Sequence, residues 1–373
     1  MTFSRRIFLE SVLAASASIL IPRMTYAQQS QVRTVAGTGV AGYEFEGEAG
    51  LAGISTPVNN PYGVIIGPDN RLYFCEVDSG RIRRLDLASG RLVTIAGNGE
   101  KAYTGDGGPA LEASFSAPHE IRFDRQNNLY VVERDAHVVR RIDQASNQVS
   151  TLAGNGEPGF SGDGGPAAAA QFRQPHSIAF DASGDLLVCD IGNRRLRRIS
   201  MATGRIGTLA GNGESDTTPD SAPLNGTPLR GPRSIDTDDN GNAYLVLREG
   251  NAVFKVDMRN ARLERIAGTG EQGYSGDDGS ALDARFNGPK GIAFSAADRS
   301  LYIVDTENHV LRRMQLDTGT ITTVLGTGRR EDGADGDPLA CSLNRPHGVC
   351  IHNRIIYVTD SENHRIRAVS GII

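Results

Sequence analysis

The chain has 373 residues and a formal net charge of −5, with 39% hydrophobic and 22% charged residues, which is typical of a folded globular protein and excludes a disordered chain. The acidic balance disfavours nucleic acid as a partner, because duplex binding depends on neutralising phosphates. Glycine is in excess, at 45 residues, which indicates many turns between short strands, and the absence of tryptophan excludes propellers of the WD type.

The N-terminal segment 1–27 is typical of an export signal. Ser4-Arg5-Arg6-Ile7-Phe8-Leu9 fits the twin-arginine pattern S-R-R-x-F-L, an apolar stretch follows at 11–21, and small residues end the segment at Ala27. The alternative is an amphipathic first helix. We expect residues 1–27 to be a cleaved twin-arginine signal and the mature protein to be periplasmic or secreted. No later apolar run is long enough to cross a bilayer, so no membrane span is expected.

The rest of the chain is a repeat with a period of 57 in residue number. A proline opens a similar unit at Pro61, Pro118, Pro175, Pro232, Pro289 and Pro346. A glycine turn recurs in the same register, at Gly37, Gly97, Gly154, Gly211, Gly268 and Gly326, and only its first step is clearly longer than the period. Two six-fold markers in register predict six copies of one structural unit.

Each unit predicts four strands. In the third unit they are expected at 177–180, 185–190, 195–200 and 205–210, separated by turns rich in Gly and Asp. Six such units predict an all-β fold, a six-bladed β-propeller with blades starting near 61, 118, 175, 232, 289 and 346. The last unit stops after its third strand, so we expect residues 32–36 to complete the last blade and close the ring.

These units resemble NHL repeats. The pattern P-x-G-I-x-F-D-x-x-G-x-L-Y-V-x-D-x-x-N-x-R-I-R-R-I stands at 175–199 and recurs at 289–314 and 346–369. The loop S-G-D-G-G-P-A at 161–167 is similar to loops of bacterial NHL-repeat and teneurin-like propellers. The resemblance covers roughly residues 32–371 and implies the six-bladed fold. It does not imply one function, since members bind proteins or RNA and some relatives are enzymes.

The residue after each unit proline is the main candidate for function. By repeat symmetry these six residues meet at one mouth of the central channel. Imidazole suits zinc, arginine and lysine hold carboxylates, and tyrosine can transfer a proton. The alternative is structural, with the histidines bonded to neighbouring groups. The six residues are Tyr62, His119, His176, Arg233, Lys290 and His347.

A narrower resemblance concerns the third of these positions. The segment F-R-Q-P-H-S-I at 172–178 is similar to a segment of peptidylamidoglycolate lyases, in which Pro-His motifs deliver zinc ligands into the channel. This resemblance implies metal-ligand roles for His176 and His347, whereas His119 has no matched role.

Two functions follow from these candidates. The first is a binding module that presents the channel mouth and its loops to a protein, peptide or small anionic ligand. The alternative is a metal-dependent lyase or hydrolase, similar to peptidylamidoglycolate lyase or gluconolactonase. There His119, His176 and His347 would hold zinc or calcium, Arg233 and Lys290 a substrate carboxylate, and Tyr62 would transfer a proton.

Other patterns favour structural roles. Acidic residues end the second strand of five units, which suits calcium or, alternatively, acceptors for backbone N–H groups. Arginine pairs on the third strand predict ion pairs between neighbouring blades. Residues 236–241 fit half of a calcium loop but lack its final Glu, which predicts a hairpin turn. The acids are Glu76, Glu133, Asp190, Asp305 and Asp360, and the arginine pairs are Arg83-Arg84, Arg140-Arg141, Arg197-Arg198 and Arg312-Arg313.

Two local features complete the analysis. A disulfide between Cys341 and Cys350 is possible in an oxidising compartment. The fourth unit replaces the S-G-D-G-G loop with a divergent stretch, 215–230, which is a candidate for ligand or partner contact at the channel mouth, or alternatively drift under weak constraint.

Overall fold

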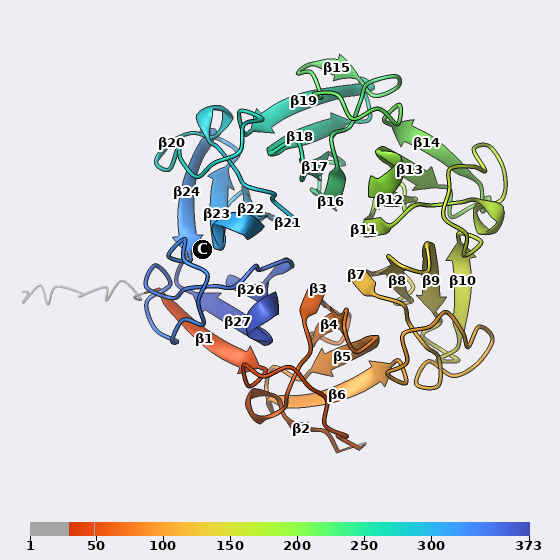
Figure 1. The fold of residues 1–373 in the computed structure, drawn as a ribbon, viewed down its shortest axis with the longest axis vertical. Helices are drawn as coiled ribbons and strands as arrows, with labels where there is room; N and C mark the ends of the chain where they lie inside the picture. The colour runs from red at the N-terminus through yellow and green to blue at the C-terminus, as the bar shows by residue number, and fades with distance from the viewer. Residues whose placement is uncertain (1–29, 48) are drawn as a thin grey trace, which may run out of the picture.

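The computed structural model describes residues 30–47 and 49–373, so the expected export signal lies outside the described residues. Six antiparallel sheets are arranged around a central axis like the blades of a propeller (Figure 1). The innermost strand begins at the repeat proline in blades 1 to 4 and two or three residues after it in blades 5 and 6. The predicted six-bladed all-β fold is therefore confirmed.

The blades follow the chain in order. Blade 1 is β3 (Pro61–Ile66), β4 (Leu72–Glu76), β5 (Arg81–Leu85) and β6 (Arg91–Ala96); blade 2 is β7 (Pro118–Phe123), β8 (Leu129–Glu133), β9 (Val138–Ile142) and β10 (Val149–Ala153); blade 3 is β11 (Pro175–Phe180), β12 (Leu186–Asp190), β13 (Arg195–Ile199) and β14 (Ile206–Ala210). Blade 4 is β16 (Pro232–Thr237), β17 (Ala243–Leu247), β18 (Ala252–Asp257) and β19 (Arg262–Ala267); blade 5 is β21 (Gly291–Ser295), β22 (Ser300–Asp305), β23 (Val310–Gln315) and β24 (Thr320–Leu325); blade 6 is β25 (Val349–His352), β26 (Ile355–Asp360), β27 (Arg365–Ser370) and β1 (Gln31–Ala36).

Short elements lie in the connections between blades. The two-residue strands β2 (Leu51–Ala52), β15 (Ala222–Pro223) and β20 (Gly279–Ser280) each add a fifth, outermost strand to a blade. Single turns of 3₁₀ helix are η1 (Gly53–Ser55), η2 (Ala167–Ala169), η3 (Ile191–Asn193), η4 (Ala281–Asp283), η5 (Thr306–Asn308) and η6 (Ser361–Asn363). None of the helices that the structure describes could cross a membrane.

The N-terminal strand closes the ring, as predicted. β1 pairs antiparallel with β27, from Gln31 opposite Ser370 to Ala36 opposite Ile366. The Thr34 hydroxyl also accepts a hydrogen bond of 2.8 Å from the Arg367 guanidinium. The first and last described strands of the propeller thus share one sheet (Figure 1).

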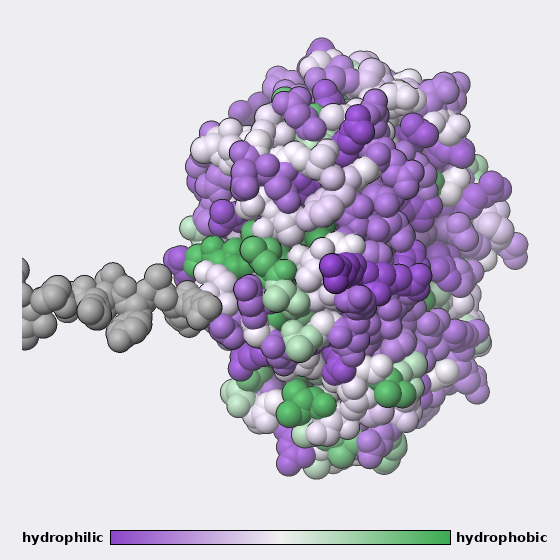
Figure 2. All heavy atoms as spheres, turned by 60° about the vertical axis from the view of Figure 1, so that its left-hand side comes forward, coloured by the Kyte–Doolittle hydropathy of each residue, from purple (hydrophilic) through white to green (hydrophobic). Residues whose placement is uncertain are grey.

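The core lies between blades. Six clusters of buried apolar side chains each join residues of two neighbouring blades, because alternate residues of a strand face opposite sides of its sheet. The face of the molecule in Figure 2 is mostly hydrophilic, with hydrophobic residues gathered in patches.

A buried ion pair recurs inside the blades, and it corrects one prediction. The acid that ends the second strand pairs with an arginine of the third strand of the same blade, not with a neighbouring blade, at N–O distances of 2.8 to 3.8 Å. A carboxylate from the loop that precedes the blade forms a second ion pair with the same guanidinium. In blade 3 an Asp163 carboxylate oxygen lies 2.7 Å from an Arg197 guanidinium nitrogen. The pairs are Glu76–Arg83, Glu133–Arg140, Asp190–Arg197, Asp305–Arg312 and Asp360–Arg367.

Blade 4 lacks this ion pair altogether. At the two equivalent positions it carries Leu247 and Phe254, both buried. In blade 4 both charged residues of the pair are therefore replaced by apolar ones, so neither of these two described positions carries an unpaired charge.

A second recurring contact links one blade to the next. The residue before the third strand has a left-handed backbone in blades 2, 4, 5 and 6, with φ between 46° and 59°. Its side chain accepts a hydrogen bond from a backbone N–H at the start of the following blade, at 2.9 to 3.1 Å. The acceptors are His137, Asn251, His309 and His364.

Candidate functional site

The six predicted residues lie at the start of the innermost strands, at one mouth of the channel. Four of their rings form a continuous arc across blades 6, 1, 2 and 3. His347 stacks on Tyr62 with ring centroids 3.8 Å apart, Tyr62 contacts His119 at 4.7 Å, and His119 contacts His176 edge-on at 4.6 Å. The histidines are at most 6% exposed, so all three imidazoles are buried.

The histidines are held neutral. His119 and His176 donate through Nδ1 to the carbonyls of Ala117 and Gln174, at 3.1 and 2.7 Å, which leaves Nε2 as an acceptor. Burial, followed by the nearby Arg233 charge, lowers the pKa of His119 and His176 well below the usual value. Burial and then Lys290 do the same for the pKa of His347.

The geometry gives no support to the predicted metal site. Within the described ranges, no three His, Cys, Asp or Glu side chains are arranged to hold a metal ion. The imidazoles pack ring against ring, and the strand-end acids are occupied by arginines and loop N–H groups. A zinc or calcium role for His119, His176 and His347 stays a prediction, and no chemical step is derived from it.

The two cations of the ring differ in their partners. Lys290 Nζ lies 2.7 Å from Glu307, which Arg345 also binds at 2.7 Å, so its charge is already compensated. Burial lowers the pKa of Lys290 to about 8 against the opposing effect of Glu307. Arg233 is 4% exposed, makes no ion pair within the described chain, and its buried Nε lacks a hydrogen-bond partner there. Burial lowers its pKa to about 10.

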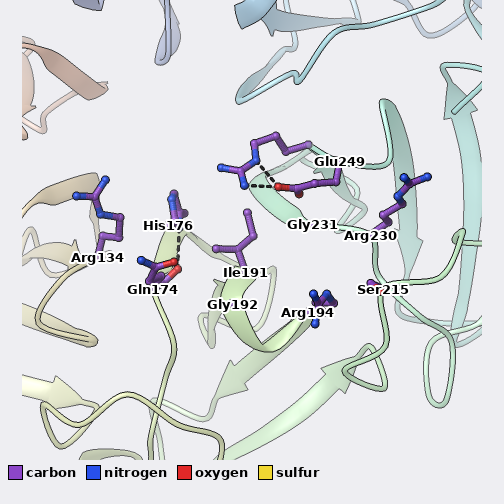
Figure 3. Close-up of a pocket in the computed structure, with 11 residues that line it drawn as sticks. Arg134, Gln174, His176, Ile191, Gly192, Arg194, Ser215, Arg230, Gly231 and Glu249 are labelled. Atoms are coloured by element: carbon purple, nitrogen blue, oxygen red, sulfur yellow. Dashed lines mark hydrogen bonds and ion pairs between the residues drawn. The ribbon is translucent and has the colours of Figure 1, made fainter. Parts of the chain in front are cut away.

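Two cavities open onto this ring. The first, of about 500 Å³, is lined by His176 and by Arg134, Arg194, Arg230 and Arg248, with Glu249 as its one acid among the described residues (Figure 3). The second, of about 520 Å³, is lined by Lys290 and its Glu307–Arg345 partners, and the two share Arg230, Arg248 and Glu249. The divergent loop of the fourth unit supplies Ser215 and Arg230 to the first cavity.

The first cavity has an excess of uncompensated positive charge. Arg134 pairs with Asp135 and Arg248 with Glu249. Neither Arg194 nor Arg230 forms an ion pair with a carboxylate among the described residues, and the Arg194 guanidinium makes one 3.4 Å bond to the Gly213 carbonyl. Arg194 occupies in blade 3 the left-handed position that holds a blade-linking side chain elsewhere, so its side chain is free to reach the cavity.

The remaining predicted sites are structural. Residues 236–237 end strand β16 and residues 238–242 form the β16–β17 hairpin turn, with Asp238 accepting backbone N–H bonds. All four cysteines are free thiols, so the possible Cys341–Cys350 disulfide is absent. At the opposite end of the channel, Arg122 binds Glu120 at 2.6 Å beside a cavity of about 200 Å³.

Because the histidines are neutral in the folded protein, the free energy of unfolding should depend on pH, and replacing one histidine should reduce this dependence. A histidine whose folded pKa is depressed takes up a proton only on unfolding, so its contribution to stability is lost as pH falls below about 6.5. We expect the change His119→Phe to reduce the loss of stability between pH 6.5 and 5 by up to about 1.4 kcal/mol per pH unit. Urea unfolding of both proteins across this range measures it, and parallel curves would contradict the prediction.

Comparisons with known proteins agree with this architecture. The family model described as "NHL repeat" matches residues 343–368, in blade 6. The chain is 27% identical over 313 residues to Protein SUPPRESSOR OF QUENCHING 1, chloroplastic, of Arabidopsis thaliana, covering 81% of this chain and 29% of that protein. It is 25% identical over 329 residues to NHL repeat-containing protein 2 of Bos taurus, covering 78% of this chain and 45% of that protein.

A solved structure extends the comparison to three dimensions. An auxiliary nutrient binding protein from Bacteroides ovatus superposes with a TM-score of 0.65 at 16% identity, over 92% of this chain and 76% of that one. This likeness concerns the fold. The chain spans less than half of the length of the two curated relatives. The matched repeat in blade 6, the similarity to an NHL repeat-containing protein and the six-bladed fold together show that the chain carries an NHL repeat and resembles NHL-repeat β-propellers.

Proposed function

We propose that this propeller is a ligand-binding module that captures a small anionic molecule at the channel mouth. The observation that carries the proposal is the group of three arginines, Arg194, Arg230 and Arg233, without a carboxylate partner in the described structure. Two of them line one cavity of about 500 Å³, a volume suited to a small molecule.

Electrostatics supports an anion at this place. Arg194 is half-buried and Arg230 is exposed at the cavity, and a bound carboxylate or phosphate would form charge-assisted hydrogen bonds with both. The chain as a whole has a net charge of −5, so the positive charge of this arginine cluster is opposite in sign to the net charge of the molecule. A pocket with walls of one charge attracts ligands of the opposite charge.

The comparisons are compatible with a binding role. The Bacteroides ovatus neighbour is described as a nutrient binding protein. Together with the twin-arginine pattern at 4–9, this leads us to propose that the protein binds its ligand after export to the periplasm or beyond. The enzymatic alternative, in which His119, His176 and His347 hold a metal, stays a prediction.

Calorimetric titration with citrate and with inorganic phosphate tests the proposal. Wild-type protein is expected to bind one of them, with an affinity that falls as salt rises, and to ignore glucose. The double change Arg194→Gln and Arg230→Gln should weaken binding at least tenfold, because each charge-assisted bond contributes about 1.5–3 kcal/mol.

Arg299→Gln provides the matched control, because Arg299 is exposed and pairs with Asp317 in blade 5, away from the channel-mouth cavities. This variant should bind as the wild type does. Absence of binding to both anions, or equal loss in the control, would reject the proposed function.

A further inference from the structure

A separate cavity of about 800 Å³ lies on the flank of blade 1. Strand β6 contributes Val93, Thr94 and Ile95 to it, and the loop before β2 contributes Tyr43 and Phe45. It shares no lining residue with the two cavities at the channel mouth.

The loop that builds this cavity departs from the other blades. The Gly37 N–H donates a hydrogen bond to the Gly53 carbonyl, whereas the N–H of the equivalent Gly97 donates to the carbonyl of Ala110. The segment between donor and acceptor is therefore longer by three residues in blade 1, which accounts for the longer step from Gly37 to Gly97 in the glycine spacing.

The loop also exchanges a glycine for an aromatic residue. Glu46 binds Arg83 and Thr94 as Asp106 binds Arg140 and Thr151, so the two acids are equivalent. The residue before the acid is Gly105, Gly162 or Gly276 in blades 2, 3 and 5, with φ between 91° and 94°. In blade 1 it is Phe45, which is 80% exposed beside the cavity.

Other apolar groups surround Phe45. Tyr43 and Leu111 line the same cavity and are 38% and 51% exposed. The Tyr43 ring is held by the Arg81 guanidinium, 3.6 Å from its centroid. Large apolar side chains gathered at an open cavity are a feature of ligand sites on soluble proteins.

One arginine that lines the cavity, Arg84, lacks among the described residues the acidic partner that its equivalents have in other blades. In blades 2 and 3 the arginine equivalent to Arg84 binds acids of its own blade, Arg141 to Asp143 at 2.5 Å and Arg198 to Asp181 at 3.0 Å. In blade 1 the acids Asp69 and Asp86 are bound instead by Arg71.

Arg84 consequently makes no ion pair among the described residues, and it lines the cavity. The Arg84 side chain also contacts the hydroxyl of Tyr73, which does not line the cavity. The one acid of the described lining, Glu46, is already bound by Arg83 and by the Thr94 hydroxyl.

From these contacts we infer a second ligand site, on the flank of blade 1, for an apolar carboxylate. Its hydrocarbon or aromatic body lies against Tyr43, Phe45, Val93 and Leu111, and its carboxylate pairs with Arg84. The inference is independent of the proposed anion site, because it uses none of the same residues.

Decanoate is the probe for this site. Displacement of the fluorescent dye 8-anilinonaphthalene-1-sulfonate from full-length protein measures its affinity, with decanol as the uncharged comparison. Arg84→Gln is expected to weaken decanoate at least fivefold and to leave decanol unchanged. Phe45→Gly, which restores the residue of the other blades, should weaken both.

Arg141→Gln is the matched control, since Arg141 is the equivalent of Arg84 in blade 2 and is already paired. It should leave both affinities unchanged, and citrate titration should be unaffected by Phe45→Gly. Failure of decanoate to bind, or equal binding to wild type, Arg84→Gln and Phe45→Gly, would overturn the inference without touching the channel-mouth proposal.

Discussion

Replacing Arg197 with phenylalanine is expected to lower the free energy of unfolding by about 3–5 kcal/mol, because the change leaves Asp190 buried without its cation. Both side chains are fully buried, and burial already raises the pKa of Asp190 to about 6 against the stabilising bonds from Asn193, Arg173 and Arg197. Removing the Arg197 guanidinium takes away one of the contacts that stabilise the Asp190 carboxylate, so the cost of burying that charge is less well compensated. Urea unfolding at pH 7 measures the change.

The double variant Asp190→Leu and Arg197→Phe should be markedly more stable than Arg197→Phe alone. It copies the pair Leu247 and Phe254 that blade 4 carries at the same positions. Apolar replacement of a whole buried ion pair is often neutral or stabilising. A double variant as unstable as the sum of its two single variants would show that the ion pair does not act as a unit.

Deletion of residues 30–36 is expected to have the second large effect, the loss of cooperative folding near room temperature. Without β1, the strand β27 becomes an open edge, and the buried Val32 and Ala36 no longer cover the core of blade 6. Arg367 also loses the Thr34 hydroxyl. Thermal unfolding followed by circular dichroism compares the shortened chain with one that starts at residue 28.

A synthetic peptide of residues 30–37 provides the control for this deletion. Added in excess, it should bind the shortened chain and raise its midpoint of unfolding, because ligands of the folded state stabilise by mass action. A shortened chain that unfolds like the parent protein would contradict the role of β1 in closing the ring.

The sequence predicts the fold because the repeat supplies it six times. Pro61 and its equivalents fix where each blade begins, and a strand at 32–36 without neighbours predicts the closure. The sequence also predicts that the six ring residues meet, since equivalent positions in a closed ring share one level. Four of their rings do form a contiguous arc.

What the sequence does not predict depends on contacts between non-equivalent positions. The acid and the arginine of each ion pair stand out in the repeat, but their pairing within a blade needs the register of strands such as β12 and β13. Arg230 belongs to the divergent stretch 215–230 that the sequence singles out, whereas Arg194 gives no signal, because the two lie on different loops that meet only in the folded ring. The longer step from Gly37 to Gly97 is the one sequence signal that points to the loop with Phe45.

The pairing of β1 with β27 has a consequence for biosynthesis. Residues 31–36 are made long before their partner strand, 365–370, because all the other strands of the ring lie between them in the sequence. During that interval the nascent chain carries an unpaired strand, and unpaired strand edges make partly folded chains prone to aggregate. We therefore expect this strand to need protection until residues 365–370 have been made.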